Sequence, residues 1–136
     1  MTAVVDASAI GSYILADEQR HLLPGLAEVL ADGVTVPPHW HVEVANLLLI
    51  ACRRGRLDEA GRRQAQETLA TVAVKVDSRS ADEVLSRSWE LAEAHRLTIY
   101  DASYLELAQR AELPLATNDS ALIRAAAAEN LMLFGR

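Results

Sequence analysis

The stretch Val4-Val5-Asp6-Ala7-Ser8-Ala9-Ile10 joins a short apolar run to a helical pattern through a single acid. The two valines indicate a short buried strand near the N-terminus. The residues after Asp6 predict a helix that runs to about residue 16. An aspartate is also among the best helix caps, so this position alone leaves a structural and a chemical role open.

The alternation of short apolar runs and helical segments continues along the chain. Further strands are predicted at residues 34–36, 72–76, 115–117 and 131–134, with a brief extended piece at 97–99. Further helices are predicted over residues 21–31, 39–54, 57–71, 80–95, 101–111 and 119–128. Ser80-Ala81-Asp82-Glu83 has the capping-box pattern for the fourth of these. Such alternation predicts an α/β fold, with a mainly parallel sheet covered by helices on both faces.

The length of 136 residues and the 51% hydrophobic content are ordinary for one globular domain, so we expect a single domain over residues 1–136. The N-terminus lacks a secretory-signal pattern, and the longest apolar run is too short to span a bilayer. The one cysteine, Cys52, cannot form an internal disulfide. These features favour a cytoplasmic protein without a membrane partner.

The net charge of −6 is opposite in sign to that of most nucleic-acid-binding chains. If four carboxylates are gathered around a cation, the net charge of the remaining residues is −2. The charge therefore neither supports nor excludes a nucleic-acid substrate.

Three aspartates follow predicted strands and precede predicted helices: Asp6, Asp101 and Asp119. In open parallel sheets, ligands bind outside the carboxyl ends of the strands. Capping remains an alternative for each aspartate taken alone.

Glu43 has no such alternative, because nearly all of its neighbours over residues 42–52 are apolar. A helix that is hydrophobic around most of its circumference is buried, and a buried carboxylate needs a partner. The partner is either a distant arginine or a bound cation. Magnesium or manganese suits a cluster of carboxylates, and such an ion supports phosphodiester hydrolysis by a metal-activated water.

With these acids placed, the chain resembles the PIN-domain nucleases, and among them the VapC toxins of bacterial toxin–antitoxin pairs. The resemblance is carried, in the family's order, by four stretches that span most of the chain: residues 4–9, 43–48, 97–108 and 115–122.

The resemblance implies a three-layer α/β/α PIN domain with Mg²⁺- or Mn²⁺-dependent endoribonuclease activity on an RNA substrate. It implies that Asp6, Glu43, Asp101 and Asp119 are the catalytic and metal-binding acids. Ser8, Thr117 and Asn118 are assigned to positioning a ligand, a water or the phosphate. A VapB-like antitoxin and a homodimer are the implied partners.

Other functions fit less well. A phosphatase of the haloacid-dehalogenase type requires a second aspartate where this chain has Ser8. A receiver domain requires a lysine near the last strand, whereas Lys75 lies mid-chain. A PIN nuclease that acts on other RNA or DNA, outside a toxin–antitoxin pair, stays open, as does a catalytically silent PIN-like binding module.

Two groups of side chains have an unassigned role at this point. The arginines between residues 53 and 63 either form a solvated helix face or contact phosphate or an acidic partner. Tyr100 and Tyr104, one helical turn apart, are interpreted as packing residues, and His39 and His41 as structural or surface residues. RNA recognition is expected to rest on phosphate, metal and RNA shape.

Overall fold

Four short parallel strands form the centre of the fold, in the order β3-β2-β1-β4. The computed structural model describes residues 2–136. The strands are β1 (Ala3–Val5), β2 (Val34–Val36), β3 (Val74–Val76) and β4 (Leu115–Ala116). In the register, Ala3 lies opposite Val34 and Val5 opposite Ala116. Because β1 has a neighbour on each side and helices over both faces, all three of its side chains are buried, as its continuous apolar sequence requires.

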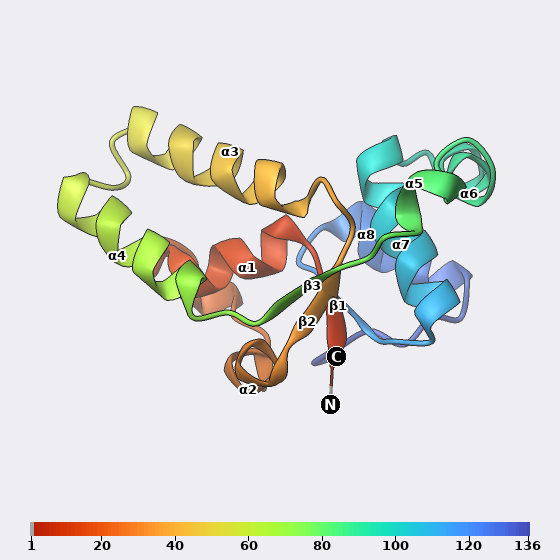
Figure 1. The fold of residues 1–136 in the computed structure, drawn as a ribbon, viewed down its shortest axis with the longest axis horizontal. Helices are drawn as coiled ribbons and strands as arrows, with labels where there is room; N and C mark the ends of the chain where they lie inside the picture. Colours follow the sequence, from red (N-terminus) through yellow and green to blue (C-terminus); the bar gives the residue numbers. More distant parts are fainter. Residues whose placement is uncertain (1) are drawn as a thin grey trace.

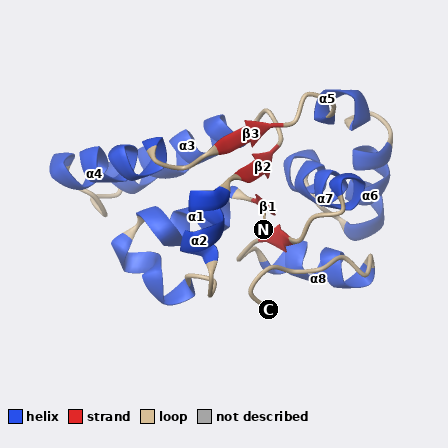
Figure 2. Cartoon of the chain, turned by 60° about the horizontal axis from the view of Figure 1, so that its bottom comes forward, coloured by secondary structure: helices blue, strands red, loops and turns tan. Residues whose placement is uncertain are grey.

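Helices cover both faces of this sheet (Figures 1 and 2). One layer holds α1 (Ala7–Ile14), the 3₁₀ helix η1 (Ala16–His21), α2 (Leu26–Asp32), α3 (Trp40–Arg53) and α4 (Glu59–Ala70). The other holds α5 (Ser80–Glu83), α6 (Arg87–His95), α7 (Ile99–Ala111) and α8 (Ser120–Ala128). The predicted three-layer α/β/α fold with a parallel sheet is confirmed.

Several predicted boundaries are wrong for local reasons. The helix expected from residue 21 begins only at Leu26, after a turn in which Gly25 takes the left-handed φ of 82°. The helix expected over residues 80–95 is two helices, α5 and α6. Ser80 does not cap either one, because its hydroxyl donates to Asp77 Oδ2 at 2.6 Å. Residues 131–134 form only an isolated bridge, between Leu115 and Leu133.

The extended piece expected at residues 97–99 is instead the entrance to α7. Thr98 is the cap of this helix, and its hydroxyl accepts a hydrogen bond from the backbone N–H of Asp101 at 3.1 Å. Asp101 therefore lies in the first helical turn and not at a strand end.

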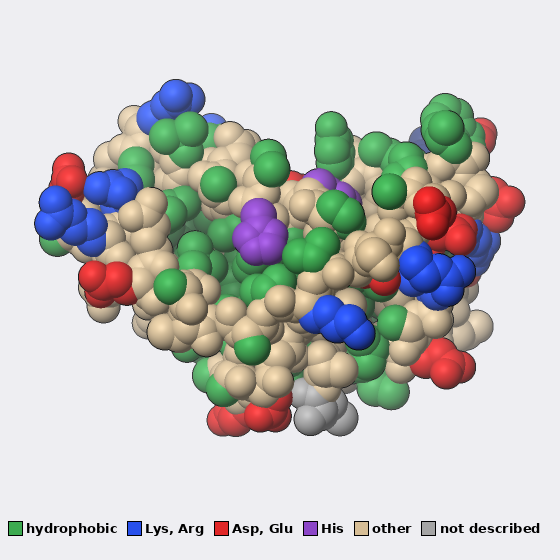
Figure 3. All heavy atoms as spheres, in the orientation of Figure 1, with side chains coloured by type: hydrophobic (Ala, Val, Ile, Leu, Met, Phe, Trp, Pro, Cys, Tyr) green, Lys and Arg blue, Asp and Glu red, His purple; other side chains and the backbone are tan. Residues whose placement is uncertain are grey.

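The expectation that α3 is buried around most of its circumference is also wrong. One face, including Trp40, Val44 and Leu48, is buried against α1 and α4, whereas Val42 is 72% exposed. Figure 3 shows hydrophobic side chains in the hollow between α3 and α4. Among the described helices, none combines the length and apolar character needed to cross a membrane.

Candidate active site

The four predicted acids are supplied by separate elements. Asp6 directly follows β1 and caps α1, and Asp119 caps α8 after β4. Glu43 and Asp101 lie in the first turns of α3 and α7. Asp6 and Asp119 are therefore helix caps as well as candidate site residues, whereas neither Glu43 nor Asp101 is a cap.

Asp6 is the most buried of these acids and is held by three donors. Its Oδ1 accepts from the hydroxyl of Ser8 at 2.7 Å and from the backbone N–H of Ala9 at 2.9 Å. Its Oδ2 accepts from the hydroxyl of Thr117 at 2.5 Å. Burial raises the pKa of Asp6 to about 6, against the lowering effect of these hydrogen bonds, and the charge of Asp101 raises it further. All three donors are neutral, so the carboxylate keeps an uncompensated charge when ionised.

The hydroxyls of Ser8 and Thr117 connect Asp6 to the loop that carries Asp119. Ser8 Oγ accepts the backbone N–H of Asn118 at 2.9 Å, and Thr117 Oγ1 accepts that of Asp119 at 3.0 Å. The structure thus brings both predicted hydroxyl residues to Asp6. Asn118 contributes its backbone, while its side-chain Oδ1 accepts a hydrogen bond from Arg136 at 3.3 Å.

Glu43 is held by a tyrosine that sequence reasoning placed only in the core. The hydroxyl of Tyr104, on α7, donates to Glu43 Oε1 at 2.6 Å. His39 lies one turn before Glu43, with its Nε2 3.5 Å from the same oxygen. A distant arginine, one of the two partners considered for Glu43, does not pair with it within residues 2–136. Only the spacing of Tyr104, three residues after Asp101, could have placed it near the acids.

Asp101 experiences the charges of the other acids directly. Burial raises its pKa, and the carboxylates of Asp119 and Glu43 raise it further. The pKa of Tyr104 is likewise raised, first by burial, then by its hydrogen bond to Glu43 and by the charges of Glu43, Asp6 and Asp101. These mutual effects place the acids in one electrostatic environment.

The chemistry of this donor set fits a hard divalent cation. Within residues 2–136, no lysine or arginine forms an ion pair with any of the four acids. Carboxylates whose charges raise one another's pKa need compensating positive charge to remain ionised together. Oxygen ligands are those that Mg²⁺ and Mn²⁺ prefer. In the same residues, no three acidic, histidine or cysteine side chains converge closely enough to enclose an ion. The donors therefore suit the ion in type and charge, and its binding would have to draw them together.

The arginines near the end of α3 and in α4 largely contact acids of the same layer. Arg56 forms ion pairs with Asp17 at 2.8 Å and Glu18 at 3.1 Å. Arg62 and Arg63 both pair with Glu59. These pairs favour the interpretation of this patch as a solvated helix face over that of a phosphate-binding surface.

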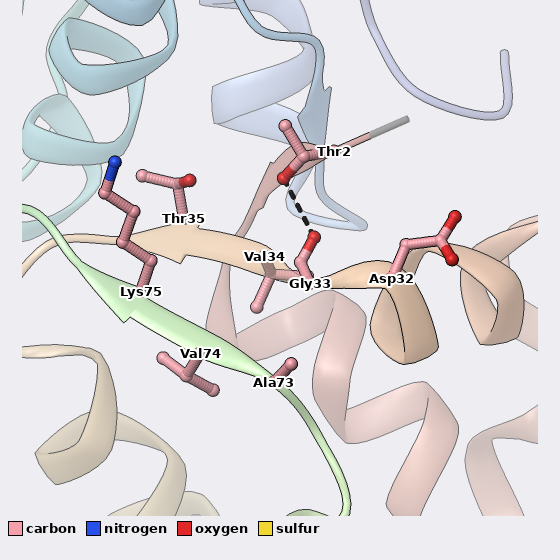
Figure 4. A pocket seen from close by; sticks show the side chains of 8 residues that line it. All are labelled: Thr2, Asp32, Gly33, Val34, Thr35, Ala73, Val74 and Lys75. Atoms are coloured by element: carbon pink, nitrogen blue, oxygen red, sulfur yellow. Dashed lines mark hydrogen bonds between the residues drawn. The ribbon is translucent and has the colours of Figure 1, made fainter.

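A separate hollow lies over the N-terminal ends of β2 and β3 (Figure 4). The hydroxyl of Thr2 in its wall donates to the carbonyl oxygen of Gly33 at 2.8 Å. This hollow lies at the N-terminal ends of the strands, whereas Asp6 follows the C-terminal end of β1. None of the four acids lines it, so we assign no chemistry to it.

Comparison with known families gives one domain-length match. The model of the PIN domain matches residues 3–128. Among characterised relatives, Ribonuclease VapC1 of Mycobacterium tuberculosis is 31% identical over 126 residues, covering 90% of this chain and 89% of that protein. Ribonuclease VapC3 of Pyrobaculum aerophilum is 33% identical over 128 residues, covering 90% and 92%. Ribonuclease VapC3 of Mycobacterium tuberculosis is 35% identical over 122 residues, covering 90% and 85%.

Solved structures agree with this fold. PAE2754 from Pyrobaculum aerophilum superposes with a TM-score of 0.63 at 31% identity, covering 92% of this chain and 87% of that chain. A toxin–antitoxin complex from Klebsiella pneumoniae contains a chain that superposes with a TM-score of 0.54 at 17% identity, which is a likeness of fold alone.

Proposed function

This chain belongs to the PIN-domain family, and on that basis we propose that it is a divalent-metal-dependent endoribonuclease, the toxin of a VapBC-type toxin–antitoxin pair. Relatives of 31 to 35% identity that bear the name Ribonuclease VapC support the activity and the pairing with an antitoxin. The substrate in this proposal is RNA, and the reaction is hydrolysis of its phosphodiester bonds.

One observation carries the proposal: hydrogen bonds join the elements that carry the four acids, and no arginine or lysine within residues 2–136 pairs with any of these acids. Thr117 bonds both Asp6 and the backbone of Asp119, and Tyr104, on the helix of Asp101, bonds Glu43. Burial raises the pKa of Asp6 and of Asp101, and the charges of neighbouring acids raise both pKa values further. A fold gains no stability from such a cluster, because mutual repulsion and burial both disfavour the charged state. The cluster is explained if its charge serves to bind a cation and, with it, an anionic substrate.

The residues of this chain have distinct tasks in the proposal. Asp6, Glu43, Asp101 and Asp119 would hold a Mg²⁺ or Mn²⁺ ion, which supplies positive charge for the phosphate oxygens and lowers the pKa of a bound water. Ser8 and Thr117 fix both oxygens of Asp6.

Tyr104 fixes Glu43 in a comparable way. Its hydroxyl holds Oε1 through a neutral hydrogen bond, which leaves Oε2 and the full negative charge available to an ion. Fixed carboxylates lower the cost of ordering ligands when the ion binds, because the orientation already exists.

The test compares RNA cleavage by wild type, Asp6→Asn and Asp82→Asn, each with Mg²⁺ and with excess chelator. Asp82 is an exposed aspartate in α5 and provides the matched control. We expect wild type and Asp82→Asn to cleave only with metal, and Asp6→Asn to lose at least about 100-fold in rate. Equal cleavage by Asp6→Asn would remove this acid from the mechanism, and full activity in chelator would end the metal proposal.

Growth tests separate the toxin from other PIN nucleases. Expression of the wild type is expected to arrest growth, and co-expression of a VapB-like antitoxin is expected to relieve the arrest. RNA cleavage in vitro without growth arrest would favour a nuclease outside a toxin–antitoxin pair. We also propose that the chain forms a homodimer, which light scattering in solution tests directly.

A further inference from the structure

The two tyrosines of α7 have opposite environments although they are one helical turn apart. Tyr104 is 1% exposed, whereas Tyr100 is 57% exposed. Tyr100 is therefore not the packing residue that its spacing suggested. Burial gives no reason for a large aromatic ring at this position.

The ring of Tyr100 is held in place by His39. The two ring centroids are 5.6 Å apart in an edge-to-face arrangement. The Nε2 atom of His39 also lies 3.2 Å from the carbonyl oxygen of Tyr100. His39 in turn packs edge-to-face on the ring of Tyr104, at 5.2 Å between centroids. The ring is thus held at one side by His39, and the rest of it is exposed to solvent.

This aromatic surface adjoins the acid cluster. Tyr100 directly precedes Asp101 in α7, and His39 lies 3.5 Å from Glu43 Oε1. Because His39 contacts both the ring of Tyr100 and the carboxylate of Glu43, a nucleic-acid chain whose phosphate is bound at the acids would have a neighbouring nucleotide within reach of Tyr100.

From this arrangement we propose that Tyr100, supported by His39, is a nucleobase-binding subsite on which an unpaired base next to the scissile phosphate stacks. The inference rests on the proposed function, since it takes RNA as the substrate. Bases that are free of a duplex stack on exposed aromatic rings largely without regard to sequence, because every base has a π-face. The subsite therefore selects single-stranded or looped RNA over a paired helix.

The experiment measures the binding and cleavage of short single-stranded oligoribonucleotides labelled with a fluorophore. Binding is measured with Mg²⁺ on an oligonucleotide with nuclease-resistant linkages, and KM and kcat are measured on the unmodified oligonucleotide, with Asp6 intact in both. Three variants are compared: Tyr100→Ala, Tyr100→Phe and the control Trp89→Ala. Trp89 is likewise exposed, at 52%, and its indole donates to Glu93 on the same helix.

Tyr100→Ala is expected to weaken oligonucleotide binding by about 5- to 100-fold and to raise KM with little change in kcat. Tyr100→Phe and Trp89→Ala should stay within about 2-fold of wild type, because the first keeps the ring and the second lies elsewhere. An oligonucleotide with an abasic site at the stacked position should bind wild type and Tyr100→Ala equally well. That equality assigns the effect to one base.

Two outcomes would overturn the subsite. Unchanged binding by Tyr100→Ala, with intact binding by the parent protein, would show that the ring takes no base, as expected if it served a protein partner. An equal loss in Tyr100→Phe would show that the ring does not act through stacking. Absence of RNA binding by the parent protein itself would instead be a failure of the proposed function.

Discussion

The structure contains two clusters of carboxylates, and they differ in whether an arginine pairs with them. In the candidate site, Asp6 follows β1 and Asp101 lies on α7. In the second cluster, Asp77 follows β3 and Glu106 lies on α7, five residues after Asp101. Similar elements thus supply acids to both.

The second cluster contains its own counter-charge. Arg110 donates to Glu106 Oε1 at 2.5 Å and to Asp77 Oδ2 at 2.7 Å. The hydrogen bond from Arg110 lowers the pKa of Asp77 to about 2, with help from the hydroxyl of Ser80. In the candidate site only neutral groups donate, and the pKa values of Asp6 and Asp101 are raised. An acid cluster that the fold neutralises is structural, and one that it leaves charged is available to a ligand.

The largest expected effect is the removal of the counter-charge. Arg110→Leu leaves Glu106, which is 2% exposed, as a buried charge without its partner. We expect a loss of about 3–5 kcal/mol in the free energy of unfolding, measured by urea denaturation. The control Arg63→Leu removes an exposed pair with Glu59 and should cost less than about 1 kcal/mol. Equal losses in both variants would contradict the structural role of the second cluster.

The pH dependence of stability should have opposite signs in the two clusters. The pKa of Asp6 is about 6 in the folded chain and 3.8 as its reference value, so the folded state binds more protons between these values. The metal-free protein should therefore lose up to about 3 kcal/mol through this group as pH rises from about 4 to 6. Denaturation curves in chelator measure the loss, and Asp6→Asn should abolish it. A slope that persists in Asp6→Asn would assign the effect to another group.

The pKa of Asp77 is shifted in the other direction, from 3.8 to about 2. Its contribution is present above pH 4 and should be lost as pH falls toward 2. We expect roughly 1–2 kcal/mol, since the pair is partly exposed to solvent. Asp77→Asn should flatten the acid limb of the stability profile, and an unchanged limb would contradict the ion pair.

Tyr104→Phe tests whether the hydroxyl of Tyr104 orients Glu43 for metal binding. Loss of the hydroxyl releases Glu43 Oε1, and we expect Mn²⁺ to bind about 10- to 100-fold more weakly by calorimetry. Tyr100→Phe makes the same change to an exposed tyrosine on the same helix and should leave the affinity unchanged. In a Glu43→Gln background, Tyr104→Phe should have no further effect. An additional loss there would show that Tyr104 does not act through Glu43.

The smallest expected effect is the change in stability caused by the same substitution, Asp to Asn, in each cluster. Asp101→Asn relieves repulsion from Asp119 and Glu43, so it should raise metal-free stability by about 0.5 kcal/mol or more while abolishing cleavage. Asp77→Asn, the same change beside an arginine, should lower stability. Thermal unfolding in chelator checks both signs. Destabilisation by Asp101→Asn would mean that this acid has a structural partner.

The hydrophobic periodicity of the sequence predicted much of this fold. Prediction from sequence failed where a residue had a tertiary partner or where packing covered only part of a helix. The apolar run before Asp6 and the positions of β2 and α4 followed from periodicity, because burial of one face imposes it. The capping-box pattern at Ser80 misled, since the hydroxyl of this residue bonds to Asp77 instead of a helix end. The apolar composition around Glu43 suggested a buried helix, but packing covers only one face of α3.

The sequence by itself determined the alternating α/β pattern, the placement of four acids along it and the family to which they belong. Tertiary structure alone decided which acids are neutralised, as Asp77 is by Arg110. It also decided that Tyr104 holds Glu43 while Tyr100 stays exposed. The reason is physical: charge compensation and burial depend on distances between side chains far apart in the chain, and these distances exist only once the helices pack on the sheet.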